Sequence, residues 1–210
     1  MWTLPNILTL ARIILAPVIA LLPFIQGYWP KVIAFVIFVI AAVSDVADGW
    51  VARNRQQVSD IGKLLDPVAD KLLLVATLVP IYWITRHPTV LYGIPWWGSL
   101  PLWVIVMLVG RELLMTVFRW EAQKRGVVIP AGREGKLKAI FQYVFIGATI
   151  AWFAWKDFLV TTRFTGRLRD VWDDIHGTVV AVTLAIALVL TVYSFVIYLI
   201  RYRALFRSRR

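Results

Sequence analysis

The sequence predicts an all-α integral membrane protein with six transmembrane helices. Hydrophobic residues make up 60% of its 210 residues, and the mean hydropathy is +0.73. Both values exceed what the core of a soluble protein of this length requires. In addition, hydrophobic stretches of about 20 residues, the length that crosses a bilayer, recur along the whole chain. No composition shift or low-complexity tract divides it, so a single membrane-embedded domain over residues 1–210 is expected.

The six predicted helices cover residues 6–26, 31–52, 64–85, 99–120, 137–155 and 177–200. The first is expected to remain in the protein, because it lacks the preceding basic residue and the small-residue cleavage site of a signal peptide. The longest polar connection, residues 155–177, has a spacing of apolar and charged residues that permits a short interfacial helix. Its acidic residues are expected to form a solvated face: Asp157, Asp170, Asp173 and Asp174.

The distribution of basic residues predicts that both termini face the cytosol. With that orientation only six of the 23 Lys and Arg residues fall in outer connections: Lys31, Arg86, Lys156, Arg163, Arg167 and Arg169. The basic cytosolic tail, about residues 201–210, is expected to contact anionic lipid head groups rather than nucleic acid. Tryptophans gather at the predicted outer ends, as in an interfacial aromatic belt: Trp29, Trp83, Trp96, Trp97, Trp103, Trp152, Trp155 and Trp172.

The available residue types limit the chemistry at the inner face. The chain has no cysteine, which excludes disulfides and thiolate metal sites. Its two histidines, His87 and His176, both fall in predicted outer connections. A reaction centre at the inner face must therefore use carboxylates, Lys, Arg or hydroxyl groups.

Four aspartates interrupt the apolar pattern in "SDVADGWVARNRQQVSDIGKLLDPVADK", residues 44 to 71: Asp45, Asp48, Asp66 and Asp70. Residues three and four apart share one face of a helix, so each pair lines one side of a helix end. The short connection between the helices favours antiparallel neighbours, which brings the pairs together. Such a cluster either takes up protons or binds cations, and oxygen ligands suit Mg²⁺, Mn²⁺ or Ca²⁺.

Small residues and an arginine accompany the aspartates. Gly49, Ala52 and Gly62 remove side-chain bulk where a phosphate must approach closely, and Arg53 offers a planar donor fork for phosphate oxygens. Metal ions, a narrow cleft and an arginine together indicate a pyrophosphate clamp.

These residues resemble a known family. The spacing Asp45-x2-Asp48-Gly49-x2-Ala52-Arg53-x8-Gly62-x3-Asp66-x3-Asp70 matches, at all eight fixed positions, the signature of CDP-alcohol phosphatidyltransferases. "LPNILTLARIILAP" at 4–17 and "GRELLMTVFRWEAQKRGVVIPAGREGKLKAIFQ" at 110–142 are similar to the glycerophosphate-using bacterial branch of that family. From about residue 156 onward only the hydropathy matches.

The resemblance implies a six-helix enzyme of the cytoplasmic membrane, commonly a homodimer, whose site faces the cytosol. Such enzymes transfer a phosphatidyl group from CDP-diacylglycerol to an alcohol and release CMP. By this resemblance the four aspartates hold one or two Mg²⁺ or Mn²⁺ ions, and Asp70 is also the catalytic base. The CDP site comprises Asp45, Asp48, Gly49, Ala52, Arg53, Gly62 and Asp66.

The acceptor alcohol is predicted to be sn-glycerol 3-phosphate, which gives phosphatidylglycerophosphate as product. Similarity to the glycerophosphate-using branch assigns the acceptor phosphate to Arg111, Lys136 and Lys138. Glu112 is either the partner of Arg111 or a separate interfacial group. Phosphatidylglycerol, as in cardiolipin formation, and inositol phosphate remain alternative acceptors, since the signature does not separate them. Remote alternatives are an Asp-rich prenyltransferase, which needs a second Asp-rich motif, and a divalent-cation transporter, which favours acids at the bilayer midplane.

Overall fold

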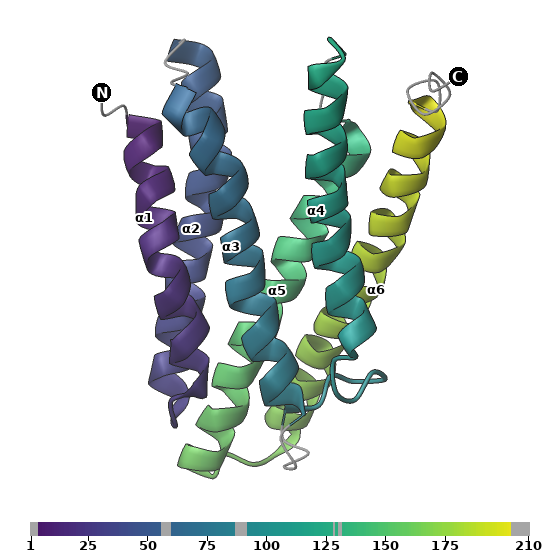
Figure 1. Ribbon diagram of the computed structural model, residues 1–210. Helices are drawn as coiled ribbons and strands as arrows, with labels where there is room; N and C mark the ends of the chain where they lie inside the picture. The colour runs from purple at the N-terminus through teal and green to yellow at the C-terminus, as the bar shows by residue number, and fades with distance from the viewer. Residues whose placement is uncertain (1–3, 56–59, 87–91, 128, 130–131, 203–210) are drawn as a thin grey trace.

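Six long α-helices form the protein in a computed structural model, which describes residues 4–55, 60–86, 92–127, 129 and 132–202 (Figure 1). The helices are α1 (Leu4–Leu21), α2 (Tyr28–Arg55), α3 (Asp60–Thr85), α4 (Leu102–Lys124), α5 (Arg133–Thr162) and α6 (Arg167–Arg201). A short 3₁₀ helix, η1 (Leu22–Phe24), follows α1. The described ranges contain no β-strand. Each predicted hydrophobic run corresponds to one helix, which confirms the all-α class.

The helices form one bundle, and several helices that pack against each other are not consecutive in the sequence. α1 packs against α2 and α3, α5 packs against α2 and α6, and α4 packs against α3 and α6. The start of α1, the end of α6, the end of α2 and the start of α3 lie at one end of the bundle, and the turn between α5 and α6 lies at the other (Figure 1). The aspartate-bearing helix ends therefore share the end at which α6 finishes with Arg201.

Five of the helices are long and apolar enough to cross a membrane: Asn6–Phe24, Tyr28–Asp45, Leu65–Thr85, Glu134–Thr162 and Arg167–Arg201. These spans indicate a multi-pass membrane protein. Helix α4 does not satisfy the same criterion, because it carries Arg111, Glu112, Arg119, Glu121 and Lys124. The sixth crossing, and the orientation of all six, stay predictions.

The segment 155–177 differs from its prediction. Helix α5 continues to Thr162 and α6 begins at Arg167, so four residues join two long helices and no separate interfacial helix forms. Arg163 has a left-handed backbone (φ 53°), and Gly166 has a φ of 117°, a conformation that glycine tolerates best. His176 accordingly lies in α6 rather than in a connection, with its Nε2 2.9 Å from the Ala148 carbonyl oxygen.

The acidic residues of this segment do not form one solvated face. Asp170 and Asp174 are exposed, as predicted, but Asp157 is buried and its Oδ2 accepts a 2.6 Å hydrogen bond from the Lys31 ammonium. The Tyr92 hydroxyl also donates to Asp157, and burial together with this hydrogen bond raises the pKa of Tyr92. The prediction of a solvated face was wrong for Asp157, since the extended helix α5 carries it into the bundle opposite Lys31.

The Lys31–Asp157 pair joins α2 to α5, and its energetics can be tested. Asp157→Asn should destabilise the protein by roughly 3 kcal/mol, because the Lys31 ammonium would stay buried without a counter-charge. The measurement is thermal unfolding of the detergent-solubilised protein, with the exposed Asp170→Asn as matched control. Replacing both partners, Lys31→Met with Asp157→Leu, should recover most of the loss. A double variant that is no more stable than Asp157→Asn would contradict the assignment of a paired buried charge.

Candidate active site

The predicted aspartates lie on two helices that α1 holds together. Asp45 belongs to α2, whereas Asp66 and Asp70 belong to α3. Gly62, on the first turns of α3, is buried. Helix α2 also carries Asp48, Gly49, Ala52 and Arg53, whose side chains lie outside the described residues.

Arg12 of α1 bridges two of the carboxylates. Its side chain is 2% exposed, and a single nitrogen, Nη1, donates to Asp45 Oδ1 at 2.5 Å and to Asp70 Oδ1 at 2.9 Å. Carboxylates of α2 and α3 thus meet at one positive charge. Charge-assisted hydrogen bonds of this kind are about twice as strong as neutral ones.

One helical turn away, α1 contacts the third carboxylate. The Thr9 hydroxyl donates to Asp66 Oδ1 at 2.7 Å. Thr9 and Arg12 are three residues apart, so they share one face of α1. The face of α1 that carries Thr9 and Arg12 is therefore the wall against which the carboxylates of α2 and α3 are fixed. The sequence showed Thr9 and Arg12 in the family's opening motif, but not this role.

The described carboxylates offer only oxygen atoms as metal ligands, the type that suits Mg²⁺ or Mn²⁺ rather than zinc. No group of three or more His, Asp or Glu side chains arranged around a metal position is found among the described residues, and the side chain of the predicted fourth ligand, Asp48, lies outside them. Asp45 and Asp70 each direct one carboxylate oxygen to Arg12.

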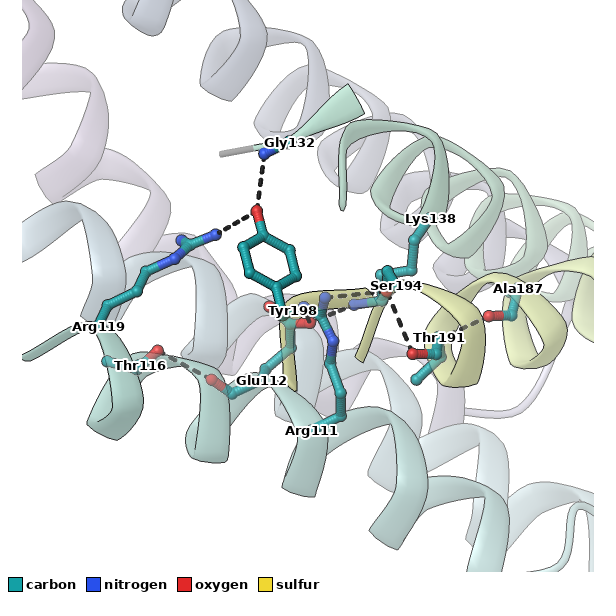
Figure 2. Close-up of polar contacts among 10 residues, drawn as sticks. All are labelled: Arg111, Glu112, Thr116, Arg119, Gly132, Lys138, Ala187, Thr191, Ser194 and Tyr198. Carbon is teal, nitrogen blue, oxygen red and sulfur yellow. Dashed lines mark hydrogen bonds and ion pairs between the residues drawn. The ribbon is translucent and has the colours of Figure 1, made fainter. Parts of the chain in front are cut away.

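A second polar cluster joins α4, α5 and α6 (Figure 2). Glu112 Oε1 accepts from Arg111 Nη1 at 2.8 Å and from the Lys138 ammonium at 2.5 Å. Arg111 Nη2 also donates to the Ser194 hydroxyl at 2.9 Å. Arg111 and Lys138 are both buried. Two of the three residues predicted to bind the acceptor phosphate therefore meet, whereas the third, Lys136, is exposed and has no ion pair with any described residue.

Tyr198 extends this cluster toward the start of α5. Its buried hydroxyl accepts from the Gly132 backbone N–H at 2.7 Å and from Arg119 Nη2 at 3.5 Å (Figure 2). Sequence reasoning missed Ser194 and Tyr198. The available signal was two hydroxyl-bearing residues four apart in the last apolar run, which places both on one helix face.

Tyr143 of α5 connects the carboxylates, the basic cluster and an apolar groove. It lies within electrostatic range of Asp45, Asp70 and Glu112. It also lines an apolar groove of about 910 Å³ between α2, α5 and α6. The groove is lined by Phe35, Phe38, Val39, Ala42, Val43, Tyr143, Val144, Gly147, Ala148, Ala151, Trp172, Ile175, His176 and Val179. One residue of the groove is thus within electrostatic range of charged residues in both polar clusters.

This combination of a helical membrane bundle and a carboxylate signature identifies the class of protein. The family model for CDP-alcohol phosphatidyltransferase matches residues 2–206, and the chain belongs to that family.

Relatives within the family are similar over much of the chain. A "Probable phosphatidylglycerophosphate synthase" of Mycobacterium tuberculosis is 40% identical over 147 residues, which are 69% of this chain and 64% of that protein. A "CDP-diacylglycerol--glycerol-3-phosphate 3-phosphatidyltransferase" of Escherichia coli strain K12 is 32% identical over 206 residues, 97% of this chain and 96% of that protein. A "CDP-diacylglycerol--glycerol-3-phosphate 3-phosphatidyltransferase 2" of Arabidopsis thaliana is 32% identical over 153 residues, which are 71% of this chain and 64% of that protein. The match thus spans just under two thirds of the Mycobacterium and Arabidopsis proteins.

The bridging role of Arg12 leads to a prediction about stability. Arg12→Met should lower the melting temperature of the solubilised protein, because Asp45 and Asp70 would repel each other without a counter-charge, at a cost of roughly 3 kcal/mol. Adding Asp45→Asn and Asp70→Asn to Arg12→Met should restore part of the loss.

The matched control is Lys71→Met. Lys71 follows Asp70 directly, but its ammonium donates to the Pro67 carbonyl oxygen at 2.9 Å. Lys71→Met should therefore change the melting temperature much less than Arg12→Met does. Equal losses in Arg12→Met and Lys71→Met would show that the bridge contributes nothing specific.

Proposed function

We propose that this protein transfers the phosphatidyl group of CDP-diacylglycerol to sn-glycerol 3-phosphate, forming phosphatidylglycerophosphate and CMP. The observation that carries the proposal is the meeting of Asp45 and Asp70, both in the family signature, at the buried Arg12. The names of the relatives from Escherichia coli and Mycobacterium tuberculosis support the same reaction.

The CDP-diacylglycerol pyrophosphate would lie along the signature residues of α2 and α3. We assign CDP binding to Asp45, Asp48, Gly49, Ala52, Arg53, Gly62 and Asp66. One or two Mg²⁺ or Mn²⁺ ions, held by Asp45, Asp48, Asp66 and Asp70, would neutralise charge on the pyrophosphate oxygens and on the departing CMP. Arg12 and Thr9 orient the carboxylates from the α1 side.

Asp70 is the proposed general base. An alcohol hydroxyl holds its proton at neutral pH, so a base within hydrogen-bond reach must accept that proton as the oxygen attacks. The Asp70 side chain is 46% exposed, against 29% for Asp45, and is thus the more accessible of the two carboxylates that Arg12 holds. The acceptor oxygen forms a bond to the phosphorus that carries diacylglycerol, the bond from that phosphorus to the CMP oxygen breaks, and the proton passes to Asp70.

The acceptor phosphate is assigned to Arg111, Lys138 and Lys136. Arg111 and Lys138 are buried cations with a common partner, Glu112, and Tyr143 links their cluster electrostatically to Asp45 and Asp70. The guanidinium and ammonium groups can exchange part of their contact with Glu112 for phosphate oxygens. Between turnovers, when no acceptor is bound, Glu112 would keep Arg111 and Lys138 in place.

The apolar groove beside Tyr143 suits the acyl chains of CDP-diacylglycerol. Polar parts of the substrate would meet water at the carboxylates, while the chains stay in contact with α2, α5 and α6. We place the enzyme in the cytoplasmic membrane, with six crossings and the site facing the cytosol, in agreement with the bias of basic residues. A single domain over residues 1–210 and a homodimer are parts of the same proposal.

The proposed reaction is tested by CMP release from the solubilised protein supplied with CDP-diacylglycerol and Mg²⁺ or Mn²⁺. The acceptors to compare are glycerol 3-phosphate, phosphatidylglycerol, inositol phosphate, inositol and serine. Turnover is expected with glycerol 3-phosphate alone, and it should stop on chelation of the metal. Asp70→Asn should lower kcat by about 100-fold or more, the range for loss of a general base.

The control for Asp70→Asn is Asp174→Asn, an exposed carboxylate on α6. Turnover with another acceptor would contradict the assignment of glycerol 3-phosphate while keeping the reaction class. Absence of CMP with every acceptor would contradict the reaction class itself.

Replacing a cation of the acceptor site should raise the KM for glycerol 3-phosphate and leave the KM for CDP-diacylglycerol nearly unchanged. Lys138→Gln is expected to raise the KM for glycerol 3-phosphate about tenfold to 100-fold, as for the loss of a hydrogen bond between charged groups. The KM for CDP-diacylglycerol should change less than threefold by the same reasoning. Lys124→Gln is the matched control, since the Lys124 ammonium lies over the Trp120 ring at the exposed end of α4. An increase in the KM for CDP-diacylglycerol alone would contradict the assignment of Lys138 to the acceptor phosphate.

A further inference from the structure

A small basic cavity lies at the turn between α5 and α6. This turn is at the end of the bundle opposite the start of α1 and the end of α6 (Figure 1). Its volume is about 250 Å³, and its charged lining residues are Lys156, Arg163 and Arg169. No acidic residue lines it. The cavity is separate from the carboxylates and from the basic cluster around Glu112.

Two of its three cations form no ion pair with any residue that the structure describes. The Lys156 ammonium is paired with Asp173 Oδ2 at 2.5 Å. Neither Arg163 nor Arg169 forms an ion pair within the part of the chain that the structure describes, and the Arg169 Nε is a buried donor without a hydrogen-bond partner. A buried, unpaired guanidinium N–H is costly unless an acceptor binds to it.

Half of the six basic residues predicted at this end of the bundle line the cavity. Of the other three, Lys31 is paired with Asp157, the Arg86 guanidinium lies over the Tyr82 ring at 4.3 Å, and Arg167 is exposed beside the cavity. The cavity therefore gathers three cations on a side that carries few of them.

The adjoining backbone adds to the attraction for anions. Helix α6 begins at Arg167, two residues after Thr165 of the cavity wall, and its N-cap Gly166 has no side chain to cap it. Free N–H groups at a helix N-terminus carry a partial positive charge.

Apart from Thr165, the remaining lining residues are apolar. Leu159, Val160 and Phe164 line the cavity beside the arginines, and Val160 is 62% exposed on the outside of α5. The volume is below the roughly 300–1,000 Å³ of pockets that enclose a whole small molecule. A phosphate group could enter while attached apolar chains stay outside, along α5.

We infer that the α5–α6 turn binds the phosphate group of an anionic phospholipid, in the leaflet opposite to the carboxylate site. The phosphate oxygens accept from Arg163 and Arg169, and the acyl chains lie against Val160 and its neighbours. A zwitterionic lipid is disfavoured, because the cavity offers no carboxylate for its ammonium group. The inference does not depend on the proposed function.

A local probe can test the site, because the chain has no cysteine. Val160→Cys, labelled with a polarity-sensitive fluorophore, is reconstituted into phosphatidylcholine nanodiscs that contain increasing fractions of phosphatidylglycerol. We expect a saturable change in emission. Half-saturation should require about fivefold more phosphatidylglycerol in Arg163→Gln and in Arg169→Gln, as for loss of one basic contact to an anionic lipid.

Arg167→Gln is the matched control, since Arg167 is exposed next to the cavity and does not line it. Arg163→Lys and Arg169→Lys, which keep the charge, should retain most of the binding and exclude loss of folding as the cause. An emission change that is linear in phosphatidylglycerol and equal in all variants would overturn the inference in favour of bulk surface charge. Saturable binding of inorganic phosphate in detergent, without a response to the lipid, would overturn it in favour of a free anion.

Discussion

The arrangement of α1, α2 and α3 depends on one electrostatic constraint: carboxylates close together in an apolar bundle must share a positive charge. Arg12 meets that constraint by donating from one nitrogen to Asp45 and Asp70. Without it, like charges partly withdrawn from water would repel or take up protons. Because α1 supplies the cation, it must pack against the carboxylate-bearing faces of both neighbours, as it does.

The same rule organises the polar residues elsewhere in the bundle. Lys31 is paired with Asp157, Arg111 and Lys138 share Glu112, and Lys156 is paired with Asp173. The Lys31–Asp157, Lys138–Glu112 and Lys156–Asp173 pairs each join two different helices. Polar contacts thereby fix which helices are neighbours, while apolar packing supplies most of the burial. The Asp45–Asp70 pair differs from these others because, among the described residues, one cation bridges two carboxylates.

The sequence located all six helices, because a hydrophobic stretch of roughly 20 residues marks each of them. The i, i+4 spacing also placed Asp66 and Asp70 on one face of α3, where both contact α1. The roles of these carboxylates stay predictions. Partners distant in sequence were not predictable. Arg12 and Asp45 are 33 residues apart, and nothing local to either names the other.

The error at Asp157 has the same origin. Asp157 was expected in solvent because it falls in the longest polar connection of the sequence, but Lys31, 126 residues away, holds it inside the bundle. Helix α4 was located correctly although it carries too much charge to satisfy a simple hydropathy criterion. Its Glu112 is paired with Arg111 of the same helix and with Lys138 of α5, and hydropathy registers neither pairing.

The most direct test of this account is binding of Mn²⁺ to the solubilised protein, measured by the loss of the free-ion electron paramagnetic resonance signal. The account predicts saturable binding to the unaltered chain and its loss in the double variant Asp45→Asn with Asp70→Asn. Melting curves would establish that the variant remains folded. Failure of the unaltered chain to bind Mn²⁺, or equal binding by the double variant, would contradict the claim that these carboxylates form a cation site.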